Sequence, residues 1–158
     1  MSSTDAGTAS STEMAELSTI DMGLEVVTVP VSDVDRAKRF YQSLGWRLDI
    51  EVVTDDIHQV QMTPPRSQCS IHIGRGITAM EPGSLDRLIL AVKDIDAARD
   101  DLIGRGVDVG AVEEQPKPPG FDLPGRSYFA YASFRDPDGN GWLLQEVTTR
   151  IPGRVWDD

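Results

Sequence analysis

Few side chains in this sequence could carry out acid–base or metal chemistry at neutral pH. The chain has two histidines, His58 and His72, and one cysteine, Cys69. A thiol nucleophile needs a base nearby, and Cys69 has only Ser67 and Ser70 beside it, so we predict that it is buried as a small apolar residue. A lone histidine in a strand is more often packed or at the surface than a ligand, which is how we interpret both histidines.

Charge and composition exclude several classes of partner. The 158 residues include 15 basic and 26 acidic ones, a formal net charge of −11, and no basic stripe that could follow a phosphate backbone or an anionic lipid surface. We therefore expect no nucleic-acid partner and no membrane partner. No run approaches the roughly 18 to 20 apolar residues of a membrane span, and residues 1–35 lack the Lys or Arg that begins a signal peptide. These features predict a cytoplasmic protein.

The two ends of the chain differ in composition from the middle. Residues 1–20 are dominated by Ser, Thr, Ala and Gly and contain no aromatic side chain. Such a segment cannot bury enough surface to offset its chain entropy, so we predict a disordered acidic tail over residues 1–20. Residues 151–158 form a second, short tail, and the single cysteine excludes an intrachain disulfide.

The middle of the chain contains an internal repeat. The stretch Val27–Leu48 matches Leu88–Val109 at an offset of 61 residues, so that Asp33 falls on Asp94 and Gly45 on Gly106. Each copy reads as a β-branched strand followed by a polar helix start, Ser32-Asp33 or Lys93-Asp94. The glycine of each copy lies where a left-handed helix C-cap is expected.

Three strand-like segments follow each glycine, which predicts an α+β fold of two tandem βαβββ modules. The modules span residues 21–75 and 85–150, with a linker over 76–84. The expected strands after the helices are 46–53, 58–63 and 69–74, then 107–112, 128–134 and 142–147. A turn at Asp136-Pro137-Asp138-Gly139 joins the last two.

Three features together resemble the vicinal oxygen chelate superfamily, which contains glyoxalase I, bleomycin-resistance proteins and extradiol dioxygenases. They are the paired V-x-D-[VI]-D-x-A repeats, Phe40-Tyr41 followed by Leu44-Gly45, and the closing DPDGN at 136–140. The resemblance covers about residues 22–150. It implies that the modules form a cup-shaped open barrel and that the protein is a homodimer. It does not select a reaction, because this scaffold serves enzymes and binding proteins alike.

The resemblance also implies where a metal would be held. Family enzymes bind a divalent metal with His, Glu or Gln side chains, and the corresponding positions here are Val26, Arg87, Leu143 and, within a residue or two, His72. Valine and leucine have no donor atom and arginine has no lone pair, so we predict no metal and no cofactor. The alternative is one divalent ion, Zn, Ni, Mn or Fe, at a displaced site that uses Gln145 or Glu146.

The same positions predict which side chains would contact a ligand. Strand side chains alternate, so the cavity side should carry Thr28, Arg87, Ile89, Leu143 and Gln145. Such an apolar set with few polar groups suits a small molecule, and Arg87 would favour an anion, unless it extends to solvent at a strand end. The Pro-rich segment Gln115–Arg126 could fold over the cup and bring Phe121 with it, and Tyr131 could line the rim.

These features leave three interpretations of function. The first is a metal-free protein that binds a small aromatic or anionic molecule for sequestration, resistance or sensing. The second is an enzyme, a glyoxalase-like lyase or isomerase or a dioxygenase, using a displaced metal or acid–base chemistry by His72, Glu146 or Tyr131. The third is a structural domain whose cup is filled by its own side chains.

Overall fold

Two aspartates begin two helices in the same way. In the computed structural model, which describes residues 16–154, helix α1 spans Val34–Ser43 and helix α2 spans Ile95–Gly104. The caps Asp33 and Asp94 both have φ of −136°, and each carboxylate accepts a hydrogen bond of 3.0 Å from a backbone N–H three residues later. The predicted helix starts are confirmed, and the glycines after the helices have the expected positive φ, +87° at Gly45 and +91° at Gly106.

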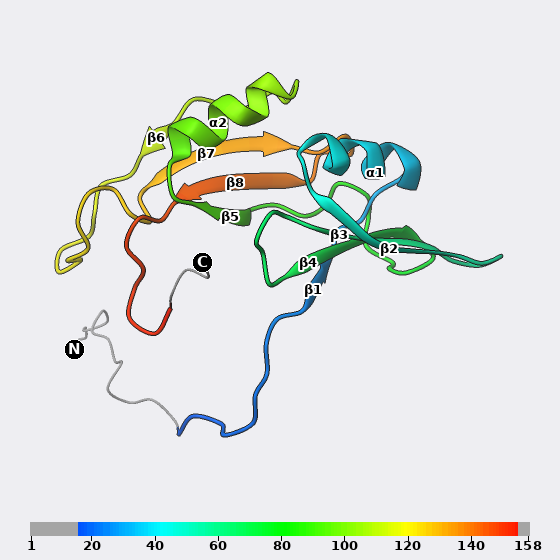
Figure 1. Cartoon of the computed structure of the whole chain (residues 1–158), viewed down its shortest axis with the longest axis horizontal. Coiled ribbons are helices and arrows are strands. Elements are labelled where there is room, and N and C mark those ends of the chain that lie inside the picture. The colour runs from blue at the N-terminus through cyan, green and yellow to red at the C-terminus, as the bar shows by residue number, and fades with distance from the viewer. Residues whose placement is uncertain (1–15, 155–158) are drawn as a thin grey trace, which may run out of the picture.

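Each helix lies within a βαβββ module that forms one four-stranded mixed sheet (Figure 1). The first sheet has the order β1-β4-β3-β2 and contains β1 (Val26–Thr28), β2 (Arg47–Val53), β3 (His58–Thr63) and β4 (Ser70–Arg75). The second has the order β5-β8-β7-β6 and contains β5 (Leu88–Val92), β6 (Glu113–Glu114), β7 (Ala130–Arg135) and β8 (Gly141–Glu146). In both sheets the first strand pairs in parallel with the last and the other pairs are antiparallel. The predicted fold class is confirmed.

One expected strand, over residues 107–112, is absent. Val107 and Val109 are buried in the core, as their alternation suggested, but the short strand β6 begins only at Glu113. Arg99 on α2 donates its Nε–H to the carbonyl oxygen of Gly110 at 2.7 Å and its Nη2–H to that of Val109 at 3.3 Å. The segment contacts β7 through one backbone bond, from the Gly110 N–H to the Ser133 carbonyl oxygen at 2.9 Å, and does not form a ladder before Glu113.

Both helices lie on the same side of the molecule, along the upper edge of the view in Figure 1. Helix α1 packs on β3 and β4, and α2 packs on β7 and β8. A single apolar core runs through both modules, because Trp46 of the first meets Trp142 of the second edge to face at 5.2 Å. We call the face of each sheet that points away from its helix the open face.

The predicted tails fall mostly outside the described residues. Of the segment 1–20, residues 16–20 are described; they are exposed and belong to no helix or strand. Residues 151–154 of the second tail are described and are also exposed. Within residues 16–154, neither helix is long and apolar enough to cross a membrane.

Candidate functional site

The open face of the second sheet carries most of the predicted ligand-binding side chains. Ile89 pairs with Leu143, and Gln145 pairs with Tyr131, so these four point to the same side of the sheet. Their alternate neighbours, among them Trp142, point to the helix side and are buried. Ile89 is 46% exposed, and the other three side chains are partly exposed. The face therefore offers apolar surface to a partner or ligand.

A pocket of about 590 Å³ opens on this face. Arg87, Tyr131 and Leu143, three of the residues predicted to contact a ligand, line it together with Glu113 and Phe129, whereas Ile89 and Gln145 do not. Arg87 directly precedes β5, has φ of +61° and is exposed, so its guanidinium is both at a strand end and at the pocket wall. The pocket wall combines this cation and the Glu113 carboxylate with the apolar side chains of Phe129 and Leu143, so it offers both charge and apolar surface to a ligand.

Tyr131 is held in place by its neighbour on the open face. Gln145 donates its Nε2–H to the Tyr131 hydroxyl at 3.0 Å and to the backbone oxygen of Tyr128 at 3.2 Å. Because the Tyr131 oxygen accepts this bond, its own proton is free to be donated to a ligand.

The Pro-rich loop lies beside this pocket. Gln115 and Pro116 at its start line the pocket wall. Phe121 packs edge to face on Phe129 with ring centroids 4.6 Å apart, so the predicted loop residue contacts a pocket residue. Lys117 donates to the carbonyl oxygen of Leu123 at 2.8 Å, which closes the loop on itself.

Glu146 lies on the helix side of the second sheet, away from the open face. Its Oε2 accepts the backbone N–H of Ile95 at 3.0 Å, and its Oε1 accepts the Nε–H of Arg126 at 2.7 Å. The carboxylate is thus used at the N-terminus of α2, where the helix dipole favours a negative charge. The structure does not bring Glu146 together with the other candidate residues.

The open face of the first sheet carries Thr28 and His72. These two residues are paired across β1 and β4, and Gln61 pairs with His72 across β3 and β4. This face is more polar than that of the second sheet. Five of its side chains are linked by hydrogen bonds, and we call them the polar row: His72, Gln61, Asp49, Thr63 and Ser70.

The hydrogen bonds of this polar row fix the orientation of the His72 ring. Asp49 accepts the Gln61 amide N–H at 3.2 Å, so the Gln61 oxygen faces His72 and accepts its Nε2–H at 2.9 Å. Asp49 also accepts bonds from Thr63 and, at 2.5 Å, from Arg47 Nε. The Thr63 bond is the main cause that holds the pKa of the Asp49 carboxyl below its usual range. A negative Asp49 thereby orients the whole row.

The side chains at the family metal positions do not form a donor set. His72 in the first module and Leu143 in the second occupy equivalent positions of the repeat. His72 pairs with Thr28 and Leu143 pairs with Ile89, and Thr28 and Ile89 are equivalent because they are 61 residues apart. Val26 shares the open face of the first sheet with Thr28. One imidazole, two aliphatic side chains and a guanidinium cannot hold a divalent ion, so we route no chemistry through a metal at these positions.

Cys69 is half-buried rather than fully buried, which corrects the prediction from its neighbours. It lines a cavity of about 870 Å³ between the loop before β4 and the free edge of β5. Burial is the main cause that raises the pKa of its thiol, which disfavours the thiolate and nucleophilic chemistry.

Sequence reasoning missed the polar row of the first sheet. The alternation in β3, polar Gln59, Gln61 and Thr63 against buried Val60 and Met62, is a signal that could have placed two of its members. Asp49 could not be found in this way, since a bulge between Leu48 and Ile50 shifts the register of β2. Two pocket residues were also missed: Glu113 lies in a strand of only two residues and Phe129 lies in a loop, so neither belongs to a periodic pattern that could have predicted it.

Comparisons with known proteins agree with this architecture. A model of the Glyoxalase/Bleomycin resistance protein/Dioxygenase superfamily matches residues 23–144. TnmS3, an antibiotic-binding protein from Streptomyces sp. CB03234, is 32% identical, with 83% of this chain and 99% of that chain covered and a TM-score of 0.63. A glyoxalase/bleomycin resistance protein from the same organism is also 32% identical, over 78% of this chain and 99% of its own, with a TM-score of 0.60.

A more distant structure, a member of the superfamily from Sphaerobacter thermophilus DSM 20745, is 28% identical over 80% of this chain and 98% of its own, with a TM-score of 0.61. No curated protein matches the chain significantly. The family match spans both modules and both open faces. The chain therefore belongs to the Glyoxalase/Bleomycin resistance protein/Dioxygenase superfamily.

Proposed function

We propose that this protein binds a small organic molecule that carries an aromatic ring and an anionic group, and that it does so without a metal. The observation that carries the proposal is the pocket on the open face of the second sheet, where Arg87, Tyr131 and Leu143 converge. Leu143 and Phe129 supply apolar surface for a ring, the Tyr131 hydroxyl can donate a hydrogen bond, and Arg87 can pair with a carboxylate or phosphate.

The antibiotic-binding relative supports binding rather than turnover as the role. TnmS3 shares 32% of its residues with this chain over nearly its whole length. We infer by this likeness that the ligand is a compound that the cell must sequester, resist or sense. The Pro-rich loop, which contacts the pocket through Phe121 and Phe129, would act as a lid over the bound molecule.

We also propose a homodimer. Each open face leaves apolar side chains in solvent, Ile50 at 51% and Val52 at 40% exposure on the first sheet and Ile89 at 46% on the second. A second copy that laid its first sheet over this second sheet would cover them and would add a polar wall to the pocket. Light scattering should give twice the chain mass of 17.3 kDa, and a monomer mass would contradict this arrangement.

The test of binding uses a pair of ligands that differ in charge alone. We would measure the affinity of the protein for 2-naphthoate and for 2-naphthamide by calorimetry. Arg87→Gln should weaken 2-naphthoate about 10-fold, since it removes a charge-assisted hydrogen bond, and should leave 2-naphthamide unchanged. Leu143→Ala should weaken both ligands. The control is Arg39→Gln, which removes an exposed cation from α1 on the helix side.

Two results would count against the proposal. If neither compound binds or raises the melting temperature of the protein, the pocket does not take aromatic anions. If Arg39→Gln weakens 2-naphthoate as much as Arg87→Gln does, the effect comes from net charge and not from the pocket.

A second candidate function, proton-transfer catalysis, is favoured by the polar row on the first sheet. The Nε2–H of His72 is used in the bond to Gln61, which leaves Nδ1 as a lone-pair base in the neutral ring. Turnover of a dicarbonyl–glutathione adduct that is lost in His72→Ala, and kept in His58→Ala, would support this role. Absence of turnover would favour the binding protein.

A further inference from the structure

Three potential metal ligands meet on the helix side of the first sheet. Asp35 comes from the first turn of α1, Glu51 from β2 and His58 from the start of β3, and one ligand atom of each lies within 4.8 Å of the others. His58 Nε2 and Glu51 Oε2 are 2.7 Å apart. Within residues 16–154, no other group of three His, Cys, Asp or Glu side chains is gathered in this way.

This cluster is separate from the open faces. Glu51 pairs with Val60, and His58 lies two residues before Val60 on the same strand, so both point to the side of the sheet on which Val60 is buried. His72 and Gln61 point to the other side. A cation in the cluster would therefore not be the metal of the family positions.

A cation already occupies part of the cluster. The Lys38 ammonium lies 2.7 Å from Glu51 Oε1, and Lys38 is one helical turn after Asp35 on α1. Lys38 would therefore compete with a metal ion for the Glu51 carboxylate.

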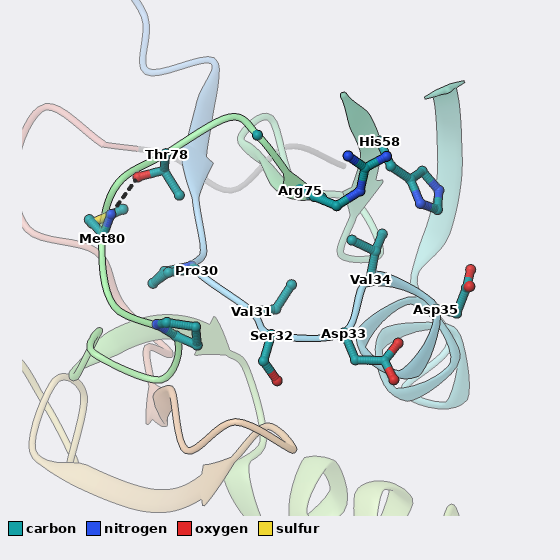
Figure 2. Close-up of a pocket in the computed structure, with 13 residues that line it drawn as sticks. Pro30, Val31, Ser32, Asp33, Val34, Asp35, His58, Arg75, Thr78 and Met80 are labelled. Carbon is teal, nitrogen blue, oxygen red and sulfur yellow. Dashed lines mark hydrogen bonds between the residues drawn. The ribbon is translucent and has the colours of Figure 1, made fainter. Parts of the chain in front are cut away.

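The cluster adjoins a pocket with room for further ligands of the ion. Asp35 and His58 line a pocket of about 700 Å³, together with residues of the β1–α1 connection and of the segment after β4 (Figure 2). In Figure 2 the Asp35 carboxylate and the His58 ring lie at the same end of the pocket, and the Arg75 guanidinium lies beside the ring. Arg75 adds a second positive charge that weakens binding of a cation, while the pocket leaves space for waters or a chelating anion.

We propose that Asp35, Glu51 and His58 form a binding site for a divalent transition-metal ion on the helix side of the first sheet. One imidazole and two carboxylates are a donor set that suits Zn²⁺, Ni²⁺ or Mn²⁺. Two donors on a tetrahedral zinc lie about 3.4 Å apart, so His58 Nε2 and Glu51 Oε2, now 2.7 Å apart, would separate by less than about 1 Å to admit the ion as Lys38 swings away. With three protein ligands and an exposed setting, the ion binds reversibly, and its remaining positions face the pocket.

The experiment titrates Zn²⁺ into the full-length, untagged protein and measures affinity by calorimetry. The chain has only two histidines, so His58→Ala and His72→Ala form a matched pair. His58→Ala should weaken Zn²⁺ binding at least about 10-fold, since one of three ligands is lost, and His72→Ala should leave it unchanged. Lys38→Gln should tighten binding several-fold, because the competing ammonium is gone.

Each result bears on the proposal. Absence of Zn²⁺ binding to the wild-type protein, or equal affinity of His58→Ala and wild type, would overturn it. Loss of binding in His72→Ala alone would place the ion on the open face instead. Weaker binding in Lys38→Gln would also overturn it, because Lys38 would then support the ion rather than compete with it. Circular dichroism of each variant checks that the fold is kept.

Discussion

Tyr41 is the buried side chain on which the contact between the modules depends. Its hydroxyl donates to Asp136 Oδ2 at 2.8 Å and accepts the indole N–H of Trp142 at 3.0 Å, and its ring packs on Trp46. Burial, and then the nearby Asp136, raise the pKa of Tyr41 far above its usual range, so the hydroxyl keeps its proton and remains a donor. One side chain of the first module thus satisfies two buried polar groups of the second.

Removal of this hydroxyl should be costly although the ring remains. Tyr41→Phe leaves a buried carboxylate oxygen and a buried indole N–H each short of a partner, and we expect a loss of about 1–3 kcal/mol in the free energy of unfolding. Urea denaturation checks this. Tyr131→Phe is the control, since that hydroxyl lies on the partly exposed open face and its loss should change stability by less than about 0.5 kcal/mol. Equal stability of Tyr41→Phe and wild type would show that water replaces the lost bonds.

Asp49 should contribute a pH-dependent part of the stability. Its bonds from Thr63, Arg47 and Gln61 depress the pKa below the ordinary value of 3.8, so the folded state binds this proton less readily than the unfolded chain. The stabilisation is fully present above that value and is lost as the pH falls through the folded pKa. Wild type should therefore exceed Asp49→Asn in melting temperature near pH 7, with a gap that narrows below about pH 4.

The control for this pH series is Asp100→Asn, which alters an exposed carboxylate on α2. Its melting temperature should follow the wild-type curve at every pH. A gap between wild type and Asp49→Asn that stays constant down to pH 2 would mean that the Asp49 charge has no part in the stability.

At the scale of elements, Arg126 joins the Pro-rich loop to a helix and two strands. Its guanidinium contacts Glu146 on β8 at 2.7 Å, Asp96 in the first turn of α2 at 2.7 Å and Glu114 on β6 at 3.3 Å. The Glu146 side chain is only 8% exposed, and it also accepts the first N–H of α2. The loop is thus tied to the second module at its C-terminal end by a cation among three carboxylates.

Arg126→Ala should loosen this end of the loop and weaken the module. A nearly buried carboxylate would lose the cation that contacts it at 2.7 Å, for which we expect a cost of about 1–3 kcal/mol. The control, Arg105→Ala, breaks a solvent-exposed pair with Asp101 one helical turn away and a long bond of 3.4 Å to the Ser43 carbonyl oxygen, and should cost about 0.5 kcal/mol or less. Proteolysis should also cut the 115–126 segment faster in Arg126→Ala. Similar losses in the two variants would mean that the three carboxylates add nothing to a single surface pair.

Sequence patterns predicted the elements well where local chemistry decides the structure. Both helix caps, both C-terminal glycines and the 136–139 turn follow from residues that bond within a few positions of themselves. The absence of the expected strand over 107–112 does not follow from such local residues, since two carbonyl oxygens of this segment bond to Arg99, which lies on α2. Gln145 and Glu146 point to opposite faces of the sheet. Which of them points to the open face depends on how β8 pairs with β5 and β7, and the sequence of β8 alone does not determine that pairing.

At the scale of the whole molecule, the two modules meet in a joint of backbone and side-chain hydrogen bonds. Asn140 donates to the carbonyl oxygen of Pro30 at 2.8 Å and accepts the N–H of Leu85 at 3.1 Å. Ser32 donates its hydroxyl to Asp138 at 2.5 Å, and Gly83 of the linker donates to Pro30 at 3.1 Å. These partners are as much as 110 residues apart in sequence, so no local pattern could have predicted them.

Gly83 tests how tightly this joint is packed. Its φ is +80°, and an added Cβ would come within 2.0 Å of the backbone oxygen of Asp138, so Gly83→Ala must displace either the linker or the turn that bonds to Pro30 and Ser32. Gly106→Ala is the matched control, because Gly106 also has a positive φ, +91°, but nothing within 4 Å of an added Cβ. The control should cost about 1 kcal/mol for its backbone strain alone, and Gly83→Ala at least about 2 kcal/mol more in urea unfolding. Equal costs would show that the joint yields freely.

The 136–140 turn of that joint has a consequence for the ancestry of the chain. The repeat implies two halves that were once alike, yet the connection before the last strand differs between them. In the second module this connection forms hydrogen bonds with Pro30 and Ser32. In the first module the equivalent connection, residues 64–69, lines a cavity beside β5. Duplicated halves that have divided their tasks in this way are no longer interchangeable. Recombination among relatives would have to transfer the 136–140 turn of the second module together with the segment before α1 of the first module. These two segments therefore evolve as one unit.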